Sequence, residues 1–349
     1  MRFEPDLLRM NDGTAVKTAA QMEQRRQELL ALLEEHAYGA FPAAVPVRGT
    51  IVNESARACS GDARLCDIEI ACDFGKESFV FPVKLFLPNT NGKKPLLVLI
   101  NFSKDPYCEY VPVEEIVDNG FALAYLYYGD ITVDDGDFSK GAARFFPRTG
   151  SGRDPGKIGI WAWGVSRAVD YLETLEWVDE KRLALIGHSR LGKTALWCAA
   201  NDMRFQYVCS NDSGCMGAAY RGTWHAGGET VSSIARVFPY WFCENFQKYK
   251  EAPGTAPFDQ HLLLACIAPR KLLVNSAALD AWADPVSEQY ACVGASPAWE
   301  AYGKRGYLGS EKPYGTDEGC LQGDIAYYKR RGVHFLGRRD WLNFMAFIG

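Results

Sequence analysis

Eight residues at positions 187–194, Gly-His-Ser-Arg-Leu-Gly-Lys-Thr, join one apolar run to another and fit two incompatible active-site patterns. As Gly-x-x-x-x-Gly-Lys-Thr, they predict a loop that cradles phosphate groups, as in a nucleotide hydrolase. As a sharp turn between a strand and a helix, they predict a nucleophilic hydroxyl at Ser189, as in an esterase. Both patterns require a buried strand followed by a buried helix, so the flanking sequence does not decide between them.

The interior of the motif favours the nucleophile. A phosphate cradle needs small residues, because consecutive backbone N–H groups must close around the anion. Three of the four interior residues are bulky here. A nucleophilic turn instead needs small neighbours where the strand and the helix cross, and Gly187 and Gly192 provide them. The second glycine follows Ser189 by three residues rather than the usual two, which departs from the general pattern.

The order of the remaining candidates agrees with nucleophile, acid and histidine along the chain. His334 is the one of five histidines that follows a late predicted strand, and it lies between two glycines. Two strand ends supply acids, the first with Asp212 and the second with Asp280 and Asp284. Either end could bring a carboxylate to the far nitrogen of His334 and stabilise its imidazolium. The sequence leaves the choice of acid open.

Composition excludes several classes of protein. A hydrophobic content of 48% and a charged content of 23% are ordinary for a globular protein. The net charge of -5 argues against nucleic acid or an acidic membrane surface as a partner. No apolar stretch is long enough to span a bilayer. The first residues hold no apolar signal-peptide core, as expected of a chain that stays in the cell or has been trimmed.

The eleven cysteines are an odd number and include no Cys-x-x-Cys spacing, so we expect no metal site of the zinc or iron–sulfur kind. Cys215 and Cys243 flank the region after Asp212 and could form a disulfide. Five others fall in predicted strands or helices, where cysteine usually acts as a small apolar residue: Cys66, Cys72, Cys198, Cys209 and Cys266.

Apolar runs alternate along the chain between strand-like and helix-like periods. The predicted strands span 66–72, 79–87, 95–101, 121–127, 182–186, 205–210, 271–276 and 326–333, the first two as an antiparallel pair. The predicted helices include 21–35, 158–175 and 193–200. Irregular segments at 214–260 and 294–323 open on the catalytic edge, where such loops shape clefts. The pattern predicts one α/β-hydrolase domain over residues 1–349, with a mostly parallel central sheet and helices on both faces.

Several stretches then give a more specific resemblance: Ser-Arg-Leu-Gly-Lys at 189–193, Ser-Asn-Asp-Ser-Gly-Cys at 210–215, Phe-Pro-Tyr-Trp-Phe-Cys at 238–243, Asp-Gln-His at 259–261, Ala-Trp-Ala-Asp-Pro at 281–285 and Gly-Val-His at 332–334. With these, nearly the whole chain resembles the glucuronoyl esterases, carbohydrate esterase family 15. The displaced second glycine belongs to that family's pattern. The bacterial branch is more similar than the fungal one, because His188 and Phe335 stand where fungal members carry cysteines.

The resemblance implies a role for each candidate. Ser189 would be the nucleophile and His334 the general base. The family's usual acid corresponds to Asp212, where many members have glutamate, and some bacterial members have an acid corresponding to Asp280. Both aspartates therefore stay candidates. Arg190 would stabilise the oxyanion with its backbone N–H and its guanidinium.

The substrate side follows from the same resemblance. Lys193 would bind sugar hydroxyls, and Glu229 and Trp282 would line the uronate pocket. The implied activity is hydrolysis of (4-O-methyl-)glucuronic acid esters, such as those that link glucuronoxylan to lignin alcohols, by a monomer without cofactor. Family members are usually secreted. A carbohydrate acetyl esterase of the same fold is the alternative, since a fold does not fix the acyl group. A nucleotide hydrolase would require magnesium.

Overall fold

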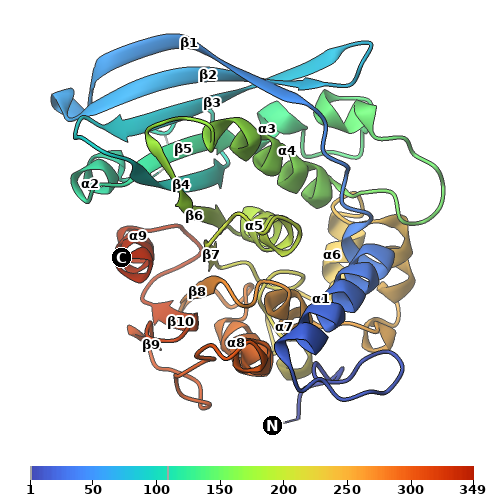
Figure 1. Cartoon of the computed structure of the whole chain (residues 1–349). Coiled ribbons are helices and arrows are strands. Elements are labelled where there is room, and N and C mark those ends of the chain that lie inside the picture. The colour runs from blue at the N-terminus through green and yellow to red at the C-terminus, as the bar shows by residue number, and fades with distance from the viewer. Residues whose placement is uncertain (1, 108–109) are drawn as a thin grey trace.

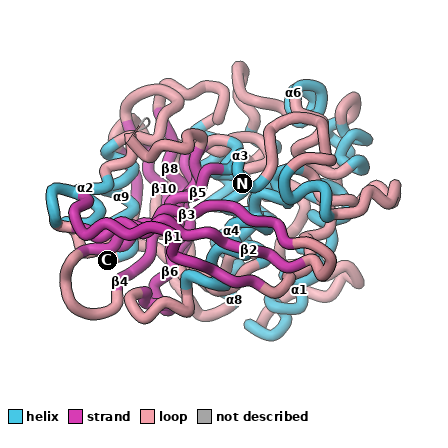
Figure 2. Tube along the Cα trace, turned by 90° about the horizontal axis from the view of Figure 1, so that it is seen from above, coloured by secondary structure: helices cyan, strands magenta, loops and turns pink. Residues whose placement is uncertain are grey.

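The computed structural model describes residues 2–107 and 110–349, and within these ranges the strands join into a single sheet. The strands are β1 (Val47–Ala58), β2 (Ala63–Asp73), β3 (Ser78–Pro88), β4 (Lys94–Asn101), β5 (Ala122–Tyr127), β6 (Val178–His188), β7 (Tyr207–Asn211), β8 (Lys271–Ala277), β9 (Glu318–Cys320) and β10 (Ile325–Arg330). Their order across the sheet is β1-β2-β3-β5-β4-β6-β7-β8-β10-β9. β1 and β9 are therefore the two edge strands (Figures 1 and 2).

The centre of the sheet is parallel, from β5 through β4, β6, β7 and β8 to β10. Strands of a parallel sheet are buried on both faces and carry near-continuous apolar runs, as Leu96–Ile100 does in β4. β1, β2 and β3 extend one side as an antiparallel meander. The carboxyl ends of parallel neighbours meet at one edge of the sheet, and that edge carries the candidate site.

Helices cover both faces of the sheet. One face carries α4 (Lys157–Leu172), α5 (Arg190–Asn201), α7 (Gln260–Ala265) and α8 (Pro285–Ala301), with α1 (Ala19–Leu33) packed outside α7 and α8. The other face carries α2 (Val113–Asp118) and α9 (Arg338–Ile348). Figure 1 shows this separation, with α2 and α9 on the left of the sheet. The short helices α3 (Tyr128–Ile131) and α6 (Val231–Val237) lie near the catalytic edge. The α/β-hydrolase fold class is confirmed.

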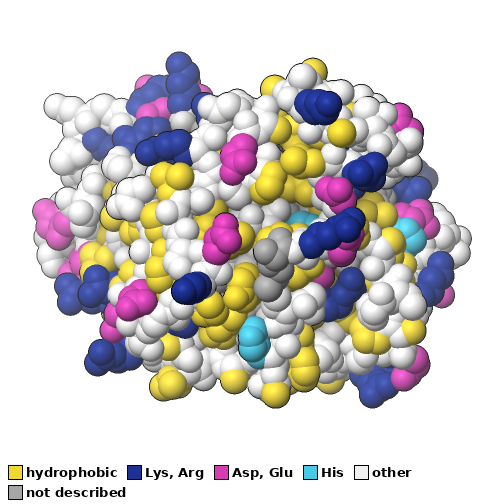
Figure 3. Space-filling model, turned by 90° about the horizontal axis from the view of Figure 1, so that it is seen from below, with side chains coloured by type: hydrophobic (Ala, Val, Ile, Leu, Met, Phe, Trp, Pro, Cys, Tyr) yellow, Lys and Arg dark blue, Asp and Glu magenta, His cyan; other side chains and the backbone are white. Residues whose placement is uncertain are grey.

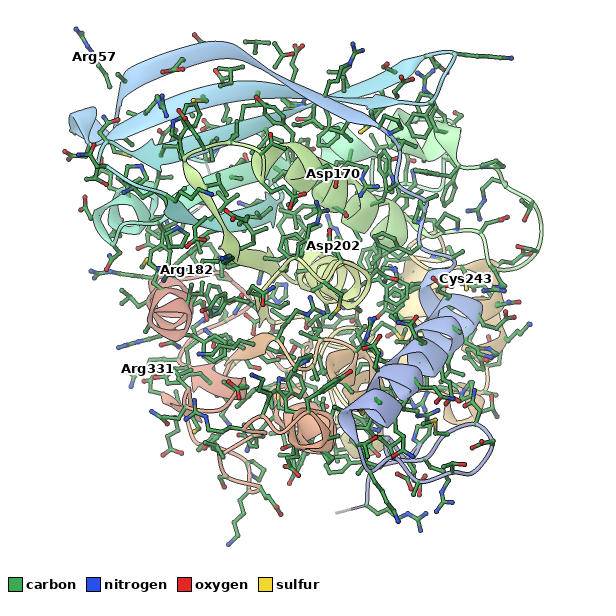
Figure 4. All side chains as sticks on the ribbon, viewed as in Figure 1. Arg57, Asp170, Arg182, Asp202, Cys243 and Arg331 are labelled. Carbon is green, nitrogen blue, oxygen red and sulfur yellow. The ribbon has the colours of Figure 1, made fainter. Side chains whose placement is uncertain are left out.

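A cluster of charges ties α4 to the end of α5. Arg204 lies 2.9 Å from Asp170 on α4 and 2.7 Å from Asp202, the residue that caps α5. Ser166 of α4 donates to Asp202 at 2.6 Å. Figure 4 labels both aspartates beside the two helices. Because α5 follows the candidate nucleophile directly, this cluster helps to hold that helix in place.

Three expectations from the sequence are corrected. The last predicted strand ends at Arg330, because the chain bends over 331–335, where the Arg330 guanidinium binds the carbonyls of Arg331, Val333 and Phe335. The segments 214–260 and 294–323 are not irregular throughout, since the first contains α6 and the second begins inside α8 and contains β9. Cys215 and Cys243 form no disulfide: all cysteines in the described ranges are free, and the Cys243 sulfur approaches the carbonyl of Glu35 at 3.9 Å, beside the end of α1 (Figure 4).

The five cysteines predicted to act as apolar residues are buried. Among the described residues, no helix combines the length and hydropathy needed to cross a bilayer. On the face seen from below in Figure 3, basic and acidic side chains are interspersed with apolar ones.

Candidate active site

A turn of one residue separates β6 from α5. β6 ends at His188 and α5 begins at Arg190, so Ser189 alone makes the turn, with φ 57° and ψ -130°. A residue other than glycine seldom adopts this conformation, and strained backbones of this kind cluster at functional sites. The Ser189 N–H donates to the carbonyl of Asn211 at 2.9 Å, which ties the turn to the end of β7. There is no loop of successive N–H groups here, so the phosphate-cradle interpretation fails.

Both glycines of the motif are required because neighbouring atoms lie where a Cβ would stand. A Cβ on Gly187 would lie 2.1 Å from the carbonyl oxygen of Leu191. A Cβ on Gly192 would lie 2.9 Å from the Cβ of Ser213. The second glycine is therefore displaced because the first turn of α5 packs on the chain that leaves β7.

His334 lies in the loop after β10, and its partner is Asp280. The Nδ1 atom of the imidazole is 2.5 Å from Oδ2 of Asp280, which belongs to the segment that follows β8. Asp280 is buried, while the His334 side chain is 40% exposed. The other oxygen of Asp280 accepts the N–H of Ala283 at 3.3 Å. A carboxylate in this position selects the tautomer that leaves Nε2 free to accept a proton.

Asp212 lies close by, but its oxygens have other partners. Oδ1 accepts the N–H of Ala277 at 2.6 Å, and Oδ2 accepts a guanidinium N–H of Arg330 at 3.2 Å. Burial raises the pKa of the Asp212 carboxyl well above its usual value, and the neighbouring Glu288 and Asp340 act in the same direction. The structure thus brings both sequence candidates to the histidine but gives the hydrogen bond to Asp280.

The carboxylates of Asp212 and Asp280 and the ring of His334 place ligand-type atoms within 4.8 Å of one another. Carboxylate and imidazole atoms at these separations are of the types that ligate a metal ion. Its hydrogen bonds account for the arrangement without one, because Asp280 meets His334 and Asp212 meets Arg330.

His188, which the sequence marked only by its difference from the fungal pattern, contacts the candidate base. The centres of the His188 and His334 rings are 4.5 Å apart, tilted by 42°. Nδ1 of His188 is 2.6 Å from Oδ1 of Asn211. Burial, followed by the proximity of His334, lowers the pKa of His188 to about 3. His188 is therefore neutral at physiological pH and does not repel a protonated His334.

Except for Asp280, the site residues that the resemblance implies line one pocket of about 130 Å³. Its walls comprise Ser189, Arg190, Lys193, Asp212, Ser213, Gly214, Glu229, Phe238, Trp241, Trp282, Ala283 and His334. The pocket contains the candidate nucleophile, the candidate base and the three residues predicted for substrate binding. Asp280 lies behind His334 rather than in the wall.

Lys193 and Glu229 form the charged part of this pocket. Nζ of Lys193 donates to Oε2 of Glu229 at 2.8 Å and to the carbonyl of Ser213 at 2.6 Å. The Glu229 N–H donates to the carbonyl of Trp282 at 2.8 Å, so the three residues are held as a unit. Trp282 is 50% exposed and leaves part of its indole open to a ligand.

Arg190 is held by an acid, Asp134, that no motif in the sequence indicates. Its Nη2 is 3.1 Å from Asp134 and 3.3 Å from the hydroxyl of Tyr128. Asp134 also accepts the indole N–H of Trp241 at 2.6 Å. The guanidinium centre lies 4.6 Å from the centre of the Phe102 ring. No local motif marks Asp134, because its partners are far away along the chain.

A one-residue strand–helix turn that presents a serine, an adjacent imidazole–carboxylate pair and a doubly covered parallel sheet define an α/β-hydrolase. Residues 70–303 match the model of a family described as glucuronyl esterase of fungi, and the chain belongs to this glucuronoyl esterase family. The predicted family and the predicted class of carboxylic ester hydrolase are confirmed.

Relatives match most or all of the chain. A carbohydrate esterase, MZ0003, from an unknown prokaryotic organism is 32% identical over 98% of this chain and 88% of its own. A 4-O-methyl-glucuronoyl methylesterase from Podospora anserina is 30% identical over 85% of this chain, which spans 60% of that protein's length. The structure of a glucuronoyl esterase from Solibacter usitatus superposes with a TM-score of 0.90 at 31% identity, covering 100% of this chain and 97% of that one.

Proposed function

We propose that the chain hydrolyses esters of glucuronic acid or 4-O-methylglucuronic acid through an acyl-enzyme on Ser189. The observation that carries the proposal is the buried Lys193–Glu229 pair in the same small pocket as the nucleophile. A pocket for an acetyl group has no need of a buried charge pair, whereas a sugar ring offers hydroxyls to both members. The relatives named 4-O-methyl-glucuronoyl methylesterase support this substrate class.

In the first half of the reaction, His334 takes the proton of the Ser189 hydroxyl as the oxygen attacks the ester carbonyl. Asp280 holds the imidazole and stabilises the imidazolium that forms. The carbonyl oxygen becomes an oxyanion at the start of α5, where the first N–H groups have no partner within the helix. The Arg190 N–H belongs to this turn, and the positive end of the helix dipole favours the charge.

The tetrahedral intermediate then collapses. The bond to the alcohol oxygen breaks, and the His334 imidazolium gives its proton to that oxygen, so the alcohol leaves neutral. Water attacks the acyl-enzyme by the same route, with His334 as base and Ser189 as the leaving group. The uronate leaves as a carboxylate.

The uronate ring would lie against the exposed indole of Trp282, which offers a flat apolar face. One Lys193 N–H beyond its two protein bonds and the second oxygen of Glu229 are then available to sugar hydroxyls. Arg190 adds a cation near the carbonyl. We propose the ester between glucuronoxylan and a lignin alcohol as the natural substrate, because such an ester presents this acyl group.

The test is the initial rate on benzyl glucuronate beside 4-nitrophenyl acetate, with EDTA present in both assays. We expect a strong preference for the glucuronate ester and no effect of the chelator. A preference for acetate would favour the acetyl esterase instead. A structural relative from a marine bacterial metagenome, 31% identical with a TM-score of 0.88 and described as a promiscuous esterase, supports testing this alternative.

Ser189→Ala is the matched control. It should lower kcat by about 10⁴-fold or more while the thermal unfolding temperature stays near that of the parent chain. Activity close to the parent's would contradict the assignment of the nucleophile.

A further inference from the structure

The backbone of the loop that carries His334 is bound by one buried side chain, that of Arg330. Arg330 is the last residue of β10, and its side chain is only 6% exposed. Its guanidinium donates to the carbonyl of Arg331 at 3.0 Å, to that of Val333 at 3.2 Å and to that of Phe335. Arg330 therefore binds the backbone on both sides of His334. Arg331 itself lies beside β9 and β10 (Figure 4).

The same guanidinium is anchored by two buried carboxylates. Nε lies 2.5 Å from Asp340 in the first turn of α9, and Nη2 lies 3.2 Å from Asp212 at the end of β7. Asp340 also accepts the side-chain amides of Asn211 and Asn275, each at 3.2 Å. The anchor thus joins β7, β8 and α9 to the loop. An arginine suits this position because its planar fork carries five N–H donors.

The contacts of Asp212 indicate that Arg330 keeps this carboxylate from binding the His334 imidazole in place of Asp280. An oxygen of Asp212 lies within 4.8 Å of both the His334 ring and Asp280, close enough to compete for the imidazole. Arg330 and the Ala277 N–H occupy its two oxygens. Without the guanidinium, Asp212 and Asp340 would face each other as buried acids without a cation, which is costly.

We propose that Arg330 is the positioning residue of the catalytic histidine. It fixes the loop at 331–335 where His334 meets Asp280, and it withholds Asp212 from the imidazole. This inference rests on the proposed function, in which His334 is the base. Arg330 touches neither the substrate nor the reacting atoms, so its effect passes entirely through His334.

The test separates positioning from folding. Arg330→Met should lower kcat on benzyl glucuronate by about 100-fold, since a misplacement near 1 Å can cost that much. KM should change by less than about threefold, because the proposed sugar-binding residues Lys193, Glu229 and Trp282 are not among the contacts of Arg330. The thermal unfolding temperature should also fall, because two carboxylates lose their cation. The double variant Arg330→Met/Asp212→Asn removes one of those charges and should recover much of the lost stability.

The positioning role requires that kcat of the double variant stays low, because the three carbonyl contacts are still missing. Recovery of kcat together with stability would mean that Arg330 only supports the fold, and would overturn the proposal. If Arg330→Met does not fold, Arg330→Lys decides. It keeps the charge but loses the fork, so kcat at least tenfold lower at unchanged KM supports positioning, and an unchanged kcat overturns it.

A second measurement does not depend on activity. The proton shared by His334 Nδ1 and Asp280 should give a far-downfield NMR resonance in the parent chain that is shifted or lost in Arg330→Lys. An unaltered resonance would contradict the proposal. If the parent chain shows the resonance but does not hydrolyse benzyl glucuronate, the proposed function fails while the positioning of His334 by Arg330 can still be judged.

Discussion

Lys193 and Glu229 form an ion pair of 2.8 Å in which each side chain is only 4% exposed. The pair joins two segments of the chain: Lys193 belongs to α5, one helical turn after Ser189, and Glu229 belongs to the insertion after β7. A buried ion pair of this kind adds little to the free energy of unfolding. Removing one partner is destabilising, because it leaves the other charge buried without a counter-charge. The pair therefore couples the insertion to α5, the helix that follows Ser189.

The first prediction concerns this coupling. Lys193→Ala should lower the free energy of unfolding by about 3–5 kcal/mol, because Glu229 loses its buried cation. It should also impair glucuronate esters far more than acetate esters, as measured by kcat/KM on both. The matched control Lys193→Met/Glu229→Gln should be more stable than the single variant. Equal losses on the two esters would make Lys193 a structural residue only.

The second prediction distinguishes the two aspartates. Asp280→Asn should lower kcat by about 10³–10⁴-fold, since an amide no longer selects the productive tautomer of His334. Asp212→Asn should have a much smaller effect on kcat, because Asp212 bonds Arg330 and Ala277 instead. Steady-state rates on benzyl glucuronate decide. A comparable fall in both single variants, or collapse only in the double variant, would show that the acids share the role.

The third prediction concerns the glycines of the turn. Gly187→Ala should abolish folding or activity, because its Cβ would meet the Leu191 carbonyl at 2.1 Å and backbone cannot yield cheaply. Gly192→Ala should be milder, since its closest contact is a side-chain carbon of Ser213 at 2.9 Å. Circular dichroism melting of both variants gives the order. A Gly187→Ala chain as stable as the parent would contradict the one-residue turn.

The fourth prediction concerns acid sensitivity. His188 has a pKa of about 3 in the folded chain against 6.5 as its ordinary value, so between these values the unfolded chain binds the extra proton. Its contribution to stability is complete above about pH 6.5 and is lost as the pH falls toward 3. Between pH 6.5 and 5, protonation of His188 in the unfolded chain lowers the free energy of unfolding by about 2 kcal/mol.

His188→Gln keeps a donor for Asn211 but cannot titrate in this range. Urea unfolding at about pH 7.5 and about pH 5 should therefore show a smaller loss of stability in the variant than in the parent chain. Equal losses would mean that His188 is protonated in the folded chain.

Local signals predicted the centre of the fold well. The strand before Ser189, the helix after it and the carboxyl-terminal positions of Asp212 and His334 follow from apolar runs and glycines a few residues apart. β1 was missed because it is an edge strand whose outer half is polar and exposed, so it lacks a clear alternation. The start of 294–323 was misjudged because Gly294 and Pro297 oppose a helix, yet α8 continues there, with Gly294 against the ring of Phe3.

Local apolar runs and glycine spacings do not predict the contacts that organise the site. Asp134 meets Arg190, and Arg330 meets Asp212, across long separations along the chain. Nothing in the neighbourhood of either residue indicates its partner. For the same reason the sequence supplied both acids but could not rank them, since the ranking depends on which oxygens Arg330 already occupies.

The two edge strands of the sheet affect the tendency of this protein to self-associate. An open edge strand offers unpaired backbone groups to a second chain and invites aggregation. β9 spans only Glu318–Cys320, and β1 carries register shifts between Ile51 and Asn53 and between Ser55 and Ala58. Arg57 projects from the β1 end (Figure 4). A short strand at one side and an irregular, charged strand at the other disfavour self-association through the sheet, so concentrated solutions should resist fibril formation.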